Sequence, residues 1–501
     1  MSKLLHYLLP CMLVTAAVSC EEAPEDGSGD TVPVEKMELN LEGISNEMIR
    51  TRTFQLQVSF YPENATDKKF TWINSNPEVV SITEEGLLTA ELEGEAIIGA
   101  QLVNGNKRAV ARITVTPYIA ENPIRTITFD KTNHDFSDIG DAPITITPTF
   151  EAMDDTQPPT DPYLKWSSSD NFVVQVDQNG KVTIIGGGSA VVRGEAIDGG
   201  NAFAECTVTV PGTAIKDRLY DSVGPLYADN YYKKVYEPLE IVVPVIDRSG
   251  NKTGETKTQV WLDRNLGASR RATESVPGAN DAHKDSESFG SYFQWSRKAD
   301  GHEKVTGWNL SGEDPVCTLT PTTGEAAADR ADVGHSSFIT INDWASNATD
   351  GLWGGAKPFS VTAGSPTDTQ FASLSYHTAW NDPTQANNPC PYGYRVPSPV
   401  ELHQLMLALS GLDKILINSP NTVTNATEKF SMQPPYLPFS GNRANNKAEV
   451  ISNFGGYIML WTNTSNSAKN GWSMRIQSNG NNLRLMSQQR GVGYPIRCIK
   501  D

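Results

Sequence analysis

The sequence predicts a multidomain protein in which two all-β sandwiches precede a domain with at least one helix. Three observations lead to this prediction. The chain has 501 residues, which is too many for one ordinary domain. A stretch of alternating apolar residues, broken by glycine and asparagine turns, occurs twice between residues 34 and 211. Residues 398–411 carry the start and stop signals of an amphipathic helix.

Residues 1–20 have the pattern of a secretory signal, with Lys3, an apolar stretch and small residues before Cys20. A transmembrane helix is the alternative, but the apolar stretch is short for one and Pro10 interrupts it. The ending Ala17-Val18-Ser19-Cys20 resembles a bacterial lipobox. This resemblance implies that Cys20 carries lipid and anchors the mature protein in the outer membrane.

Residues 21–33 are polar and contain proline, glycine and serine, so we expect a flexible acidic tether. Its acidic residues follow the cysteine at once; they are Glu21, Glu22, Glu25 and Asp26. They resemble the export tag that sends lipoproteins of Bacteroidota to the outer face of the outer membrane. The resemblance implies a lipid-anchored protein that faces the cell exterior.

A repeat fills residues 34–211. Trp72 begins the run WINSNPEVVSITEEGLLTAELEGEAII, and Trp166 begins WSSSDNFVVQVDQNGKVTIIGGGSAVV, an offset of 94 residues without a gap. The alternating apolar positions predict short antiparallel strands, and about 90 residues per unit suits a β-sandwich. We therefore expect one sandwich at 34–117 and a second at 118–211.

Both units resemble bacterial Ig-like group 2 domains in their tryptophan, serine–asparagine and glycine pattern. Such domains usually serve as stalks, so the resemblance implies a spacer. The segment Asp177-Gln178-Asn179-Gly180 is similar to the start of a calcium loop. The first unit has Thr83-Glu84-Glu85-Gly86 in its place and no bidentate glutamate follows, so we expect a hairpin turn and no metal.

Residues 212–230 contain Gly212, Gly224 and Pro225 and are predicted to link to a third domain at 231–501. That domain is rich in tryptophan and asparagine. Indole faces and amide groups suit sugar stacking and hydroxyl bonding. The alternative is that a given tryptophan fills the core of a loop-rich domain, and we favour it for any single one.

A helix is expected at 399–410. Ser398 can cap it and Glu401 can bond back to the cap, while Gly411 ends the run. One face carries an apolar stripe made by Leu402, Leu405, Met406 and Leu409. Such a stripe must pack on a large surface, so the helix is a core element.

The segment CPYGYRVPSPVEL, which starts at Cys390, resembles a signature of the Fibrobacter succinogenes major paralogous domain. Three further segments match that family in order, at 261–266, 290–295 and 496–501. The family shares the C-type-lectin-like fold, so the resemblance implies an α+β domain with a small twisted sheet and two helices. It also implies a disulfide between Cys390 and Cys498. The predicted fold class is thus two all-β Ig-like sandwiches followed by an α+β C-type-lectin-like domain.

The sequence offers little catalytic chemistry. Nucleophile-elbow, zinc-protease and phosphate-loop motifs are absent, and no two of the seven histidines lie four residues apart. The sequence has no C-x-x-C pair, which argues against a zinc site or a redox function. We expect Cys206 to be a small buried residue, and Cys317 has no evident partner. The net charge of −18 argues against nucleic acid as a partner. We expect no enzyme, cofactor or metal.

In the C-type-lectin-like fold, the variable ligand surface usually lies in the long loops before the last strands, which implies residues 440–484 here. This stretch supplies amides, guanidinium groups and an indole for a neutral glycan. The candidate ligand-binding residues are Asn442, Arg443, Asn463, Trp472 and Arg475. Trp461 ends an apolar strand and is assigned to the core, whereas Trp472 follows Asn470-Gly471 and is expected to be exposed in a turn.

These expectations combine into a non-enzymatic cell-surface lipoprotein, whose Ig-like stalk presents a lectin-like tip for adhesion or glycan binding. Its partner would be an extracellular glycan or a surface protein of a host or bacterium. A structural or fimbria-associated assembly subunit is the alternative. A surface carbohydrate-active enzyme ranks below both, because a fold does not carry an activity.

Overall fold

The computed structural model describes residues 32–501, except for 43, 45, 51, 104–106, 161, 248, 273–284, 310–315, 326–335, 342–379, 381–386, 418 and 466–469. The predicted signal, Cys20 and nearly all of the tether lie outside the described residues. Two compact units are present: one ends at Pro123 and takes in Ile197–Gly200, and the other comprises Ile124–Ala196 and Asn201–Asp501. Within the described residues, no helix combines the length and apolar character needed to cross a membrane.

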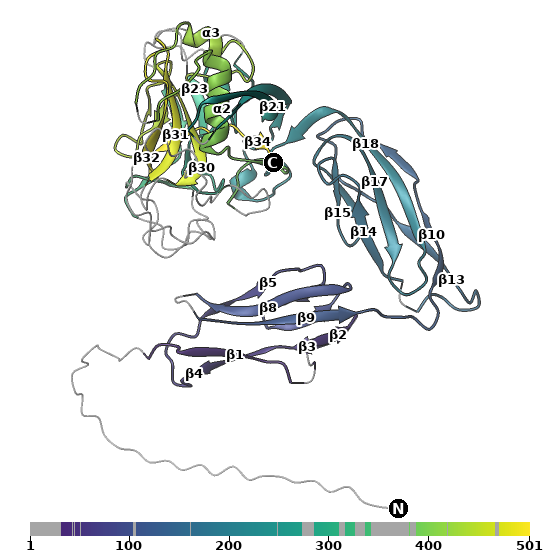
Figure 1. Ribbon diagram of the computed structural model, residues 1–501. Coiled ribbons are helices and arrows are strands. Elements are labelled where there is room, and N and C mark those ends of the chain that lie inside the picture. Colours follow the sequence, from purple (N-terminus) through teal and green to yellow (C-terminus); the bar gives the residue numbers. More distant parts are fainter. Residues whose placement is uncertain are drawn as a thin grey trace, which may run out of the picture. The chain divides into compact units, whose positions relative to one another are not determined.

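The first unit is built from three small sheets, seen in purple and blue in Figure 1. One pairs β1 (Lys36–Asn40) with β4 (Gln57–Tyr61); a second has the order β2 (Glu47–Ile49), β9 (Arg108–Thr116), β8 (Gly94–Leu102), β5 (Phe70–Asn74); a third has the order β3 (Thr53–Gln55), β7 (Leu87–Ala90), β6 (Val80–Ile82). Strands β2 and β9 run parallel, and the other pairs are antiparallel. Inward side chains that include Leu88, Ile98 and Ile113 fill the core.

The same strand order returns in the second half of the repeat. There β10 (Ile124–Phe129) pairs with β13 (Pro148–Ala152); β11 (Asn133–Asp135), β18 (Phe203–Lys216), β17 (Gly186–Ala196) and β14 (Leu164–Ser168) form the larger sheet; and β12 (Ile144–Thr145), β16 (Lys181–Ile184) and β15 (Val174–Val176) form the third. Strand β11 is parallel to β18, as β2 is to β9. The predicted repeat of two similar β-units is therefore present.

The glycines of the repeat explain why its two turns are alike. Gly86 and Gly180 both have positive φ, at 87° and 75°, and each lies beneath a tryptophan. A Cβ on Gly86 would lie 2.7 Å from Trp72, and one on Gly180 would lie 2.9 Å from Trp166. Asp177 accepts backbone N–H bonds from Asn179 and Lys181 through one carboxylate oxygen, so this segment is the expected hairpin turn.

The boundary between the second sandwich and the last domain differs from the predicted linker at 212–230. Strand β18 continues to Lys216 and pairs there with β19 (Val235–Tyr236). Asp217 is buried and accepts a hydrogen bond from the Tyr236 hydroxyl at 2.7 Å. Burial raises the pKa of Asp217 to about 6. The first residues of the predicted linker are thus ordered, and the 3₁₀ turn η1 (Pro225–Tyr227) follows them.

In its described residues, the last domain contains short strands and three helices. One sheet has the strand order β20 (Pro238–Ile246), β21 (Lys252–Leu262), β34 (Ile499–Lys500), β27 (Tyr394–Arg395), and another has the order β22 (Phe293–Gln294), β33 (Gly493–Tyr494), β28 (Asn442–Arg443), β29 (Ile451–Ser452). Two further sheets are strand pairs: β23 (Val305–Asn309) with β24 (Val316–Leu319), and β25 (Thr322–Thr323) with β26 (Phe338–Ile339). A three-stranded sheet has the order β30 (Tyr457–Ser465), β31 (Asn470–Gln477), β32 (Arg484–Gln489). The helices are α1 (Ser286–Phe289), α2 (Pro399–Ser410) and α3 (Ala426–Phe430).

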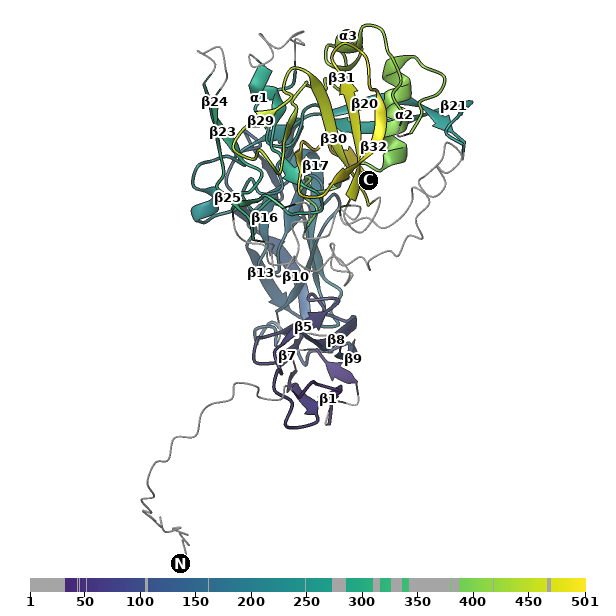
Figure 2. The same cartoon turned by 90° about the vertical axis from the view of Figure 1, so that its left-hand side faces the viewer.

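Helix α2 forms as its local signals predict. The Ser398 side chain accepts from the backbone N–H of Glu401, the Glu401 carboxylate accepts from the backbone N–H of Ser398, and Gly411 ends the helix in a left-handed conformation. Leu402, Leu405 and Met406 are fully buried. They pack with side chains of β20, β21, β30 and β31 in the largest core of the domain. Figures 1 and 2 both show α2 beside the β30–β31–β32 sheet.

A disulfide joins Cys390, before this helix, to Cys498, next to the last strand. Both cysteines are fully buried in a second core with Trp461 and Tyr494. The pairing implied by the family resemblance is confirmed. Cys206 is buried in the second sandwich as predicted, and neither it nor Cys317 is in a disulfide.

Candidate functional site

The two faces of the β30–β31–β32 sheet have different surroundings. Leu460, Met474 and Leu485 are paired across the three strands and point into the core beneath α2. Because side chains alternate along a strand, their neighbours point to the opposite face. We call that opposite face, on the strand segments Tyr457–Trp461, Gly471–Gln477 and Arg484–Gln488, the outer face.

One part of the outer face is closed by aromatic side chains. The indole N–H of Trp461 donates to the carbonyl of Phe293, and that of Trp295 donates to the carbonyl of Thr462, both at 2.8 Å. Gly471 lets Trp295 approach, since a Cβ there would lie 2.5 Å from its ring. Trp461 is fully buried, which confirms its assignment to the core.

The other part of the outer face is half-buried and polar. Its side chains are those of Tyr457, Arg475, Gln477, Arg484, Met486 and Gln488. They supply one phenol, two guanidinium groups, two amides and a thioether. Guanidinium and amide N–H groups donate to oxygen, and an aromatic face accepts apolar ring surface. This part of the outer face has the chemistry of a polar ligand site.

Arg475 and Arg484 stand directly opposite each other on adjacent strands. The Arg475 guanidinium lies 4.1 Å from the centre of the Tyr457 ring, a cation–π contact that fixes its orientation. The Nε atoms of both arginines are buried and have no hydrogen-bond partner within the described structure. Burial, with the nearby positive charge of Arg475, lowers the pKa of Arg484.

Of the five predicted ligand-binding residues, only Arg475 lies on this polar surface. Arg443 is buried, donates to Thr320 and Ala448, and stacks over Phe338 at 4.1 Å. Asn442 and Asn463 are also buried. Their side-chain carbonyls accept from Asn453 Nδ2 and Thr464 Oγ1 respectively, both at 2.8 Å. Arg443 connects segments that are distant in the sequence, whereas Asn442 and Asn463 make short-range bonds inside the domain.

The expected exposure of Trp472 is wrong. Its side chain is only 2% exposed and packs in the core beneath α2. Asn470-Gly471 is not a turn before Trp472, because β31 already begins at Asn470. Trp472 pairs with Ser487 on β32 and shares its face with Met474 and Ile476. It is therefore a core residue.

The other members of the polar surface are not among the predicted ligand residues; they are Tyr457, Gln477, Arg484, Met486 and Gln488. A signal was available, because Asn479-Gly480 is a turn pair between two alternating runs. A hairpin closed at 478–481 places Arg475 opposite Arg484, which is the register that forms. Trp380, which begins the segment Trp380-Asn381-Asp382, is buried against Trp295, while Asn381 and Asp382 lie outside the described residues.

A buried cluster of Asp300, His302 and Glu303 has ligand atoms close enough together for a metal ion. Its hydrogen bonds argue against one. His302 Nε2 accepts from the backbone N–H of Gln294 at 3.0 Å, so the proton of the neutral ring is on Nδ1. That Nδ1 lies 2.6 Å from Asp300 Oδ1 and 3.2 Å from Glu303 Oε2, and Asp300 also binds Arg297. The cluster is a hydrogen-bonded core element.

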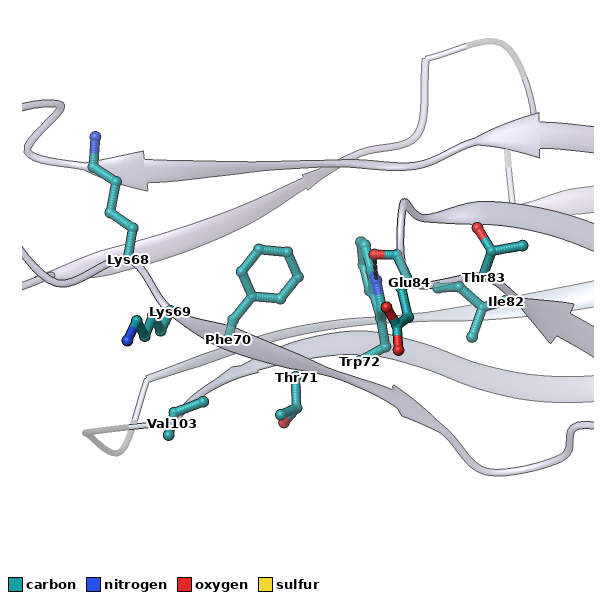
Figure 3. A pocket seen from close by; sticks show the side chains of 9 residues that line it. All are labelled: Lys68, Lys69, Phe70, Thr71, Trp72, Ile82, Thr83, Glu84 and Val103. Carbon is teal, nitrogen blue, oxygen red and sulfur yellow. Dashed lines mark hydrogen bonds between the residues drawn. The ribbon is translucent and has the colours of Figure 1, made fainter.

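A groove of about 740 Å³ runs along β5 in the first unit. Figure 3 shows Phe70 and Trp72 projecting into it, with Lys68 toward one end and Glu84 beside Trp72. The Trp72 indole N–H already donates to the carbonyl of Glu84 at 2.9 Å. In the second sandwich the equivalent Trp166 is stacked on Phe129, with ring centres 5.1 Å apart. In the first unit Phe70 instead meets Trp72 edge-on, with ring centres 5.0 Å apart.

Comparisons with known proteins agree with the repeat architecture at its first unit. Residues 45–115 match the family described as bacterial Ig-like domain (group 2). An uncharacterised protein of Clostridium acetobutylicum is 26% identical over 178 residues, or 36% of this chain; the match spans only 17% of that relative's length.

Solved structures with similarity include domains 4 and 5 of the S-layer protein SbsC, at 14% identity and a TM-score of 0.15, covering 36% of this chain and 100% of that chain. Drosophila N-cadherin EC1-4 is also similar, at 12% identity and a TM-score of 0.14, covering 46% of this chain and 60% of that chain. The family match covers one strand-rich unit of the chain. Residues 45–115 are a bacterial Ig-like domain of group 2.

Proposed function

We propose that the chain is a non-enzymatic cell-surface lipoprotein, in which Ig-like domains form a stalk and a C-type-lectin-like last domain binds glycan. The observation that carries this proposal is the polar part of the outer face. A solvated face of an antiparallel sheet is ordinarily polar, but donors that are held half-buried without acidic partners are a feature of binding sites. Here guanidinium and amide donors stand half-buried beside a tyrosine ring.

An extracellular location is supported by the disulfide between Cys390 and Cys498. Disulfides persist in oxidising compartments and are rare in reducing ones. The bacterial Ig-like domain at 45–115 is consistent with a spacer between an anchor and a binding tip. In the proposed anchor, Cys20 carries the lipid and residues 21–33 form the tether, with the protein facing the exterior from the outer membrane.

The surface of the last domain that meets the ligand is small and rigid. Three antiparallel strands hold the donors, and the core beneath α2 fixes those strands from the other side. Sites on strands place their groups more reproducibly than sites on loops. Such a surface fits the adhesive role, in which ligand is bound and left unchanged.

A glycan array with the purified full chain tests the proposal. We expect binding to a subset of saccharides, and we expect that Gln477→Ala and Gln488→Ala weaken it without lowering the melting temperature. Glu428→Ala, an exposed substitution on α3, serves as the matched control. Absence of saccharide binding, together with tight co-purification with pilus subunits, would instead support a fimbria-associated assembly subunit whose partner is protein.

A further inference from the structure

The opposed arginines of the outer face pose an electrostatic problem. Like charges directly across an antiparallel pair repel each other, because their Cβ atoms are only about 5 Å apart. Arg475 and Arg484 are in that position. The chain carries 59 aspartates and glutamates, yet none of those in the described part of the structure forms an ion pair with either arginine. Two adjacent cations are left for an external anion.

The strand register places the two arginines opposite each other on the outer face, and the charge of Arg475 acts on Arg484. Each guanidinium presents a planar fork of N–H donors that matches a carboxylate or sulfate. Tyr457 holds one fork by stacking at 4.1 Å, and the strand register places the other beside it. An anion bound between them would satisfy donors that lie half-buried and would remove the repulsion between the arginines.

The groups around the arginines suit a sugar. The Gln477 side-chain carbonyl accepts from Asn482 Nδ2 at 3.0 Å, which orients the glutamine amide and leaves its NH₂ as a donor. Gln488 lies two pairs further along the same face of β32. Gln477, two residues from Arg475, can bond a hydroxyl that flanks a charged substituent. Gln488 lies about 13 Å from Arg484 along the strand and can bond a hydroxyl of an adjoining sugar residue. Arginine clusters also bind acidic peptide motifs, so the amides beside the arginines, and not the arginines themselves, favour a sugar here.

We propose that Arg475 and Arg484 bind the anionic substituent of an acidic saccharide. This inference rests on the proposed glycan-binding function and makes it specific. It replaces the neutral glycan expected from the sequence with a sugar that bears a carboxylate or a sulfate. Arg475 and Arg484 supply the charge, and Gln477 and Gln488 contact the neighbouring hydroxyls.

The test measures affinity of the full chain by titration calorimetry. The probes are an oligogalacturonate, its neutral methyl ester, a sulfated oligosaccharide of equal length, and a poly-aspartate peptide. We expect the ester to bind at least tenfold more weakly than the acid, and the acid and sulfated arms show which anion is preferred. Arg475→Gln and Arg484→Gln should each weaken binding of the anionic saccharide at least tenfold. Arg484→Lys should fall between, because it keeps the charge but loses the fork.

Controls separate binding from folding. Arg112→Gln removes an exposed arginine that is paired with Glu95 in the first unit, and it should leave every affinity unchanged. Arg484→Gln should keep or raise the melting temperature, since it removes one of two like charges. A clear fall in melting temperature that accompanies the loss of binding would assign Arg484 a structural role and overturn the inference.

The remaining outcomes distinguish failure of the anion site from failure of the glycan-binding function. Equal affinity for the acid and its ester overturns the anion site and leaves the proposed glycan function standing. Failure of every saccharide to bind ends both proposals. Tighter binding of poly-aspartate than of every saccharide overturns the acidic-sugar assignment. It would mean that the arginine pair binds an acidic protein partner.

Discussion

Arg395 donates to both carboxylate oxygens of Glu401, at 2.8 and 2.9 Å, and its Nε donates to Asp501 at 2.7 Å. One guanidinium therefore connects β27, the first turn of α2 and the last residue of the chain. Glu401 also accepts from the backbone N–H of Ser398 to close the capping box. A single carboxylate thus joins the helix start to the strand that follows the disulfide-bonded Cys390.

Replacing Glu401 with Gln should lower the free energy of unfolding by about 1.5 to 3 kcal/mol at neutral pH, the usual range for hydrogen bonds to charged groups. Both partners are largely shielded, with side chains 16% and 15% exposed. Burial alone would raise the pKa of Glu401, but its bonds to Arg395 and Ser398 outweigh it and lower the pKa. Chemical denaturation at a series of pH values measures the effect.

The sign of the pH dependence follows from that lowered pKa. A carboxyl group with a lower pKa in the folded state stabilises above its unfolded pKa, near 4.5, and loses this contribution as the pH falls through the folded value. Wild type and Glu401→Gln should therefore converge in stability below pH 4.5. Exposed Glu428→Gln is the control and should track wild type throughout. A difference that stays constant down to the acid limit would contradict the Arg395 ion pair as its cause.

The disulfide between Cys390 and Cys498 spans 108 residues of sequence. The chain-entropy model gives about 4 to 5 kcal/mol of stabilisation for a loop of this size. The double variant Cys390→Ser/Cys498→Ser should lose much of this in the last domain, while the first unit unfolds as before. Cys317→Ser, a free thiol, is the control. Peptide mapping without reductant tests the bond in the secreted protein. Two free thiols at Cys390 and Cys498 would contradict it.

Local signals were enough to predict α2, because its cap, first turn and stop residue all lie within residues 398–411. The repeat was also predictable from local signals, since a turn glycine recurs beneath Trp72 and beneath Trp166. Trp472 was misplaced because its exposure depends on the pairing of β31 with β30 and β32, which brings in residues from 457 to 489. Arg443 failed as a ligand for a similar reason: its partner Thr320 lies 123 residues away.

Gly180→Ala should destabilise the second sandwich by about 2 to 4 kcal/mol, combining left-handed backbone strain with overpacking. The added Cβ would lie 2.6 Å from the carbonyl of Ile146 and 2.9 Å from Trp166. Gly212→Ala is a matched control, because Gly212 has a similar φ of 80° and no atom within 4 Å of the added Cβ. Thermal unfolding should show the larger loss for Gly180→Ala. Equal losses would mean that backbone strain alone sets the cost.

The variant Cys20→Ala tests the proposed anchor, because the sulfur of a lipobox cysteine forms the thioether bond to the lipid. We expect the variant to leave the membrane fraction or to retain residues 1–20. Cys11→Ala, inside the predicted signal, should fractionate as wild type. Normal removal of the signal together with unchanged membrane fractionation of the Cys20 variant would refute the lipoprotein proposal.

Trp472→Ala distinguishes the core position in the structure from the exposed position expected from the sequence. The indole lies beneath α2 and is 2% exposed, so its removal should cost about 3 to 5 kcal/mol. Met432→Ala, at a side chain that is 50% exposed, should change stability little. Denaturant unfolding of the two variants measures the difference. A Trp472→Ala protein that melts like wild type and loses only saccharide binding would return Trp472 to the ligand surface, and with it the neutral-glycan site.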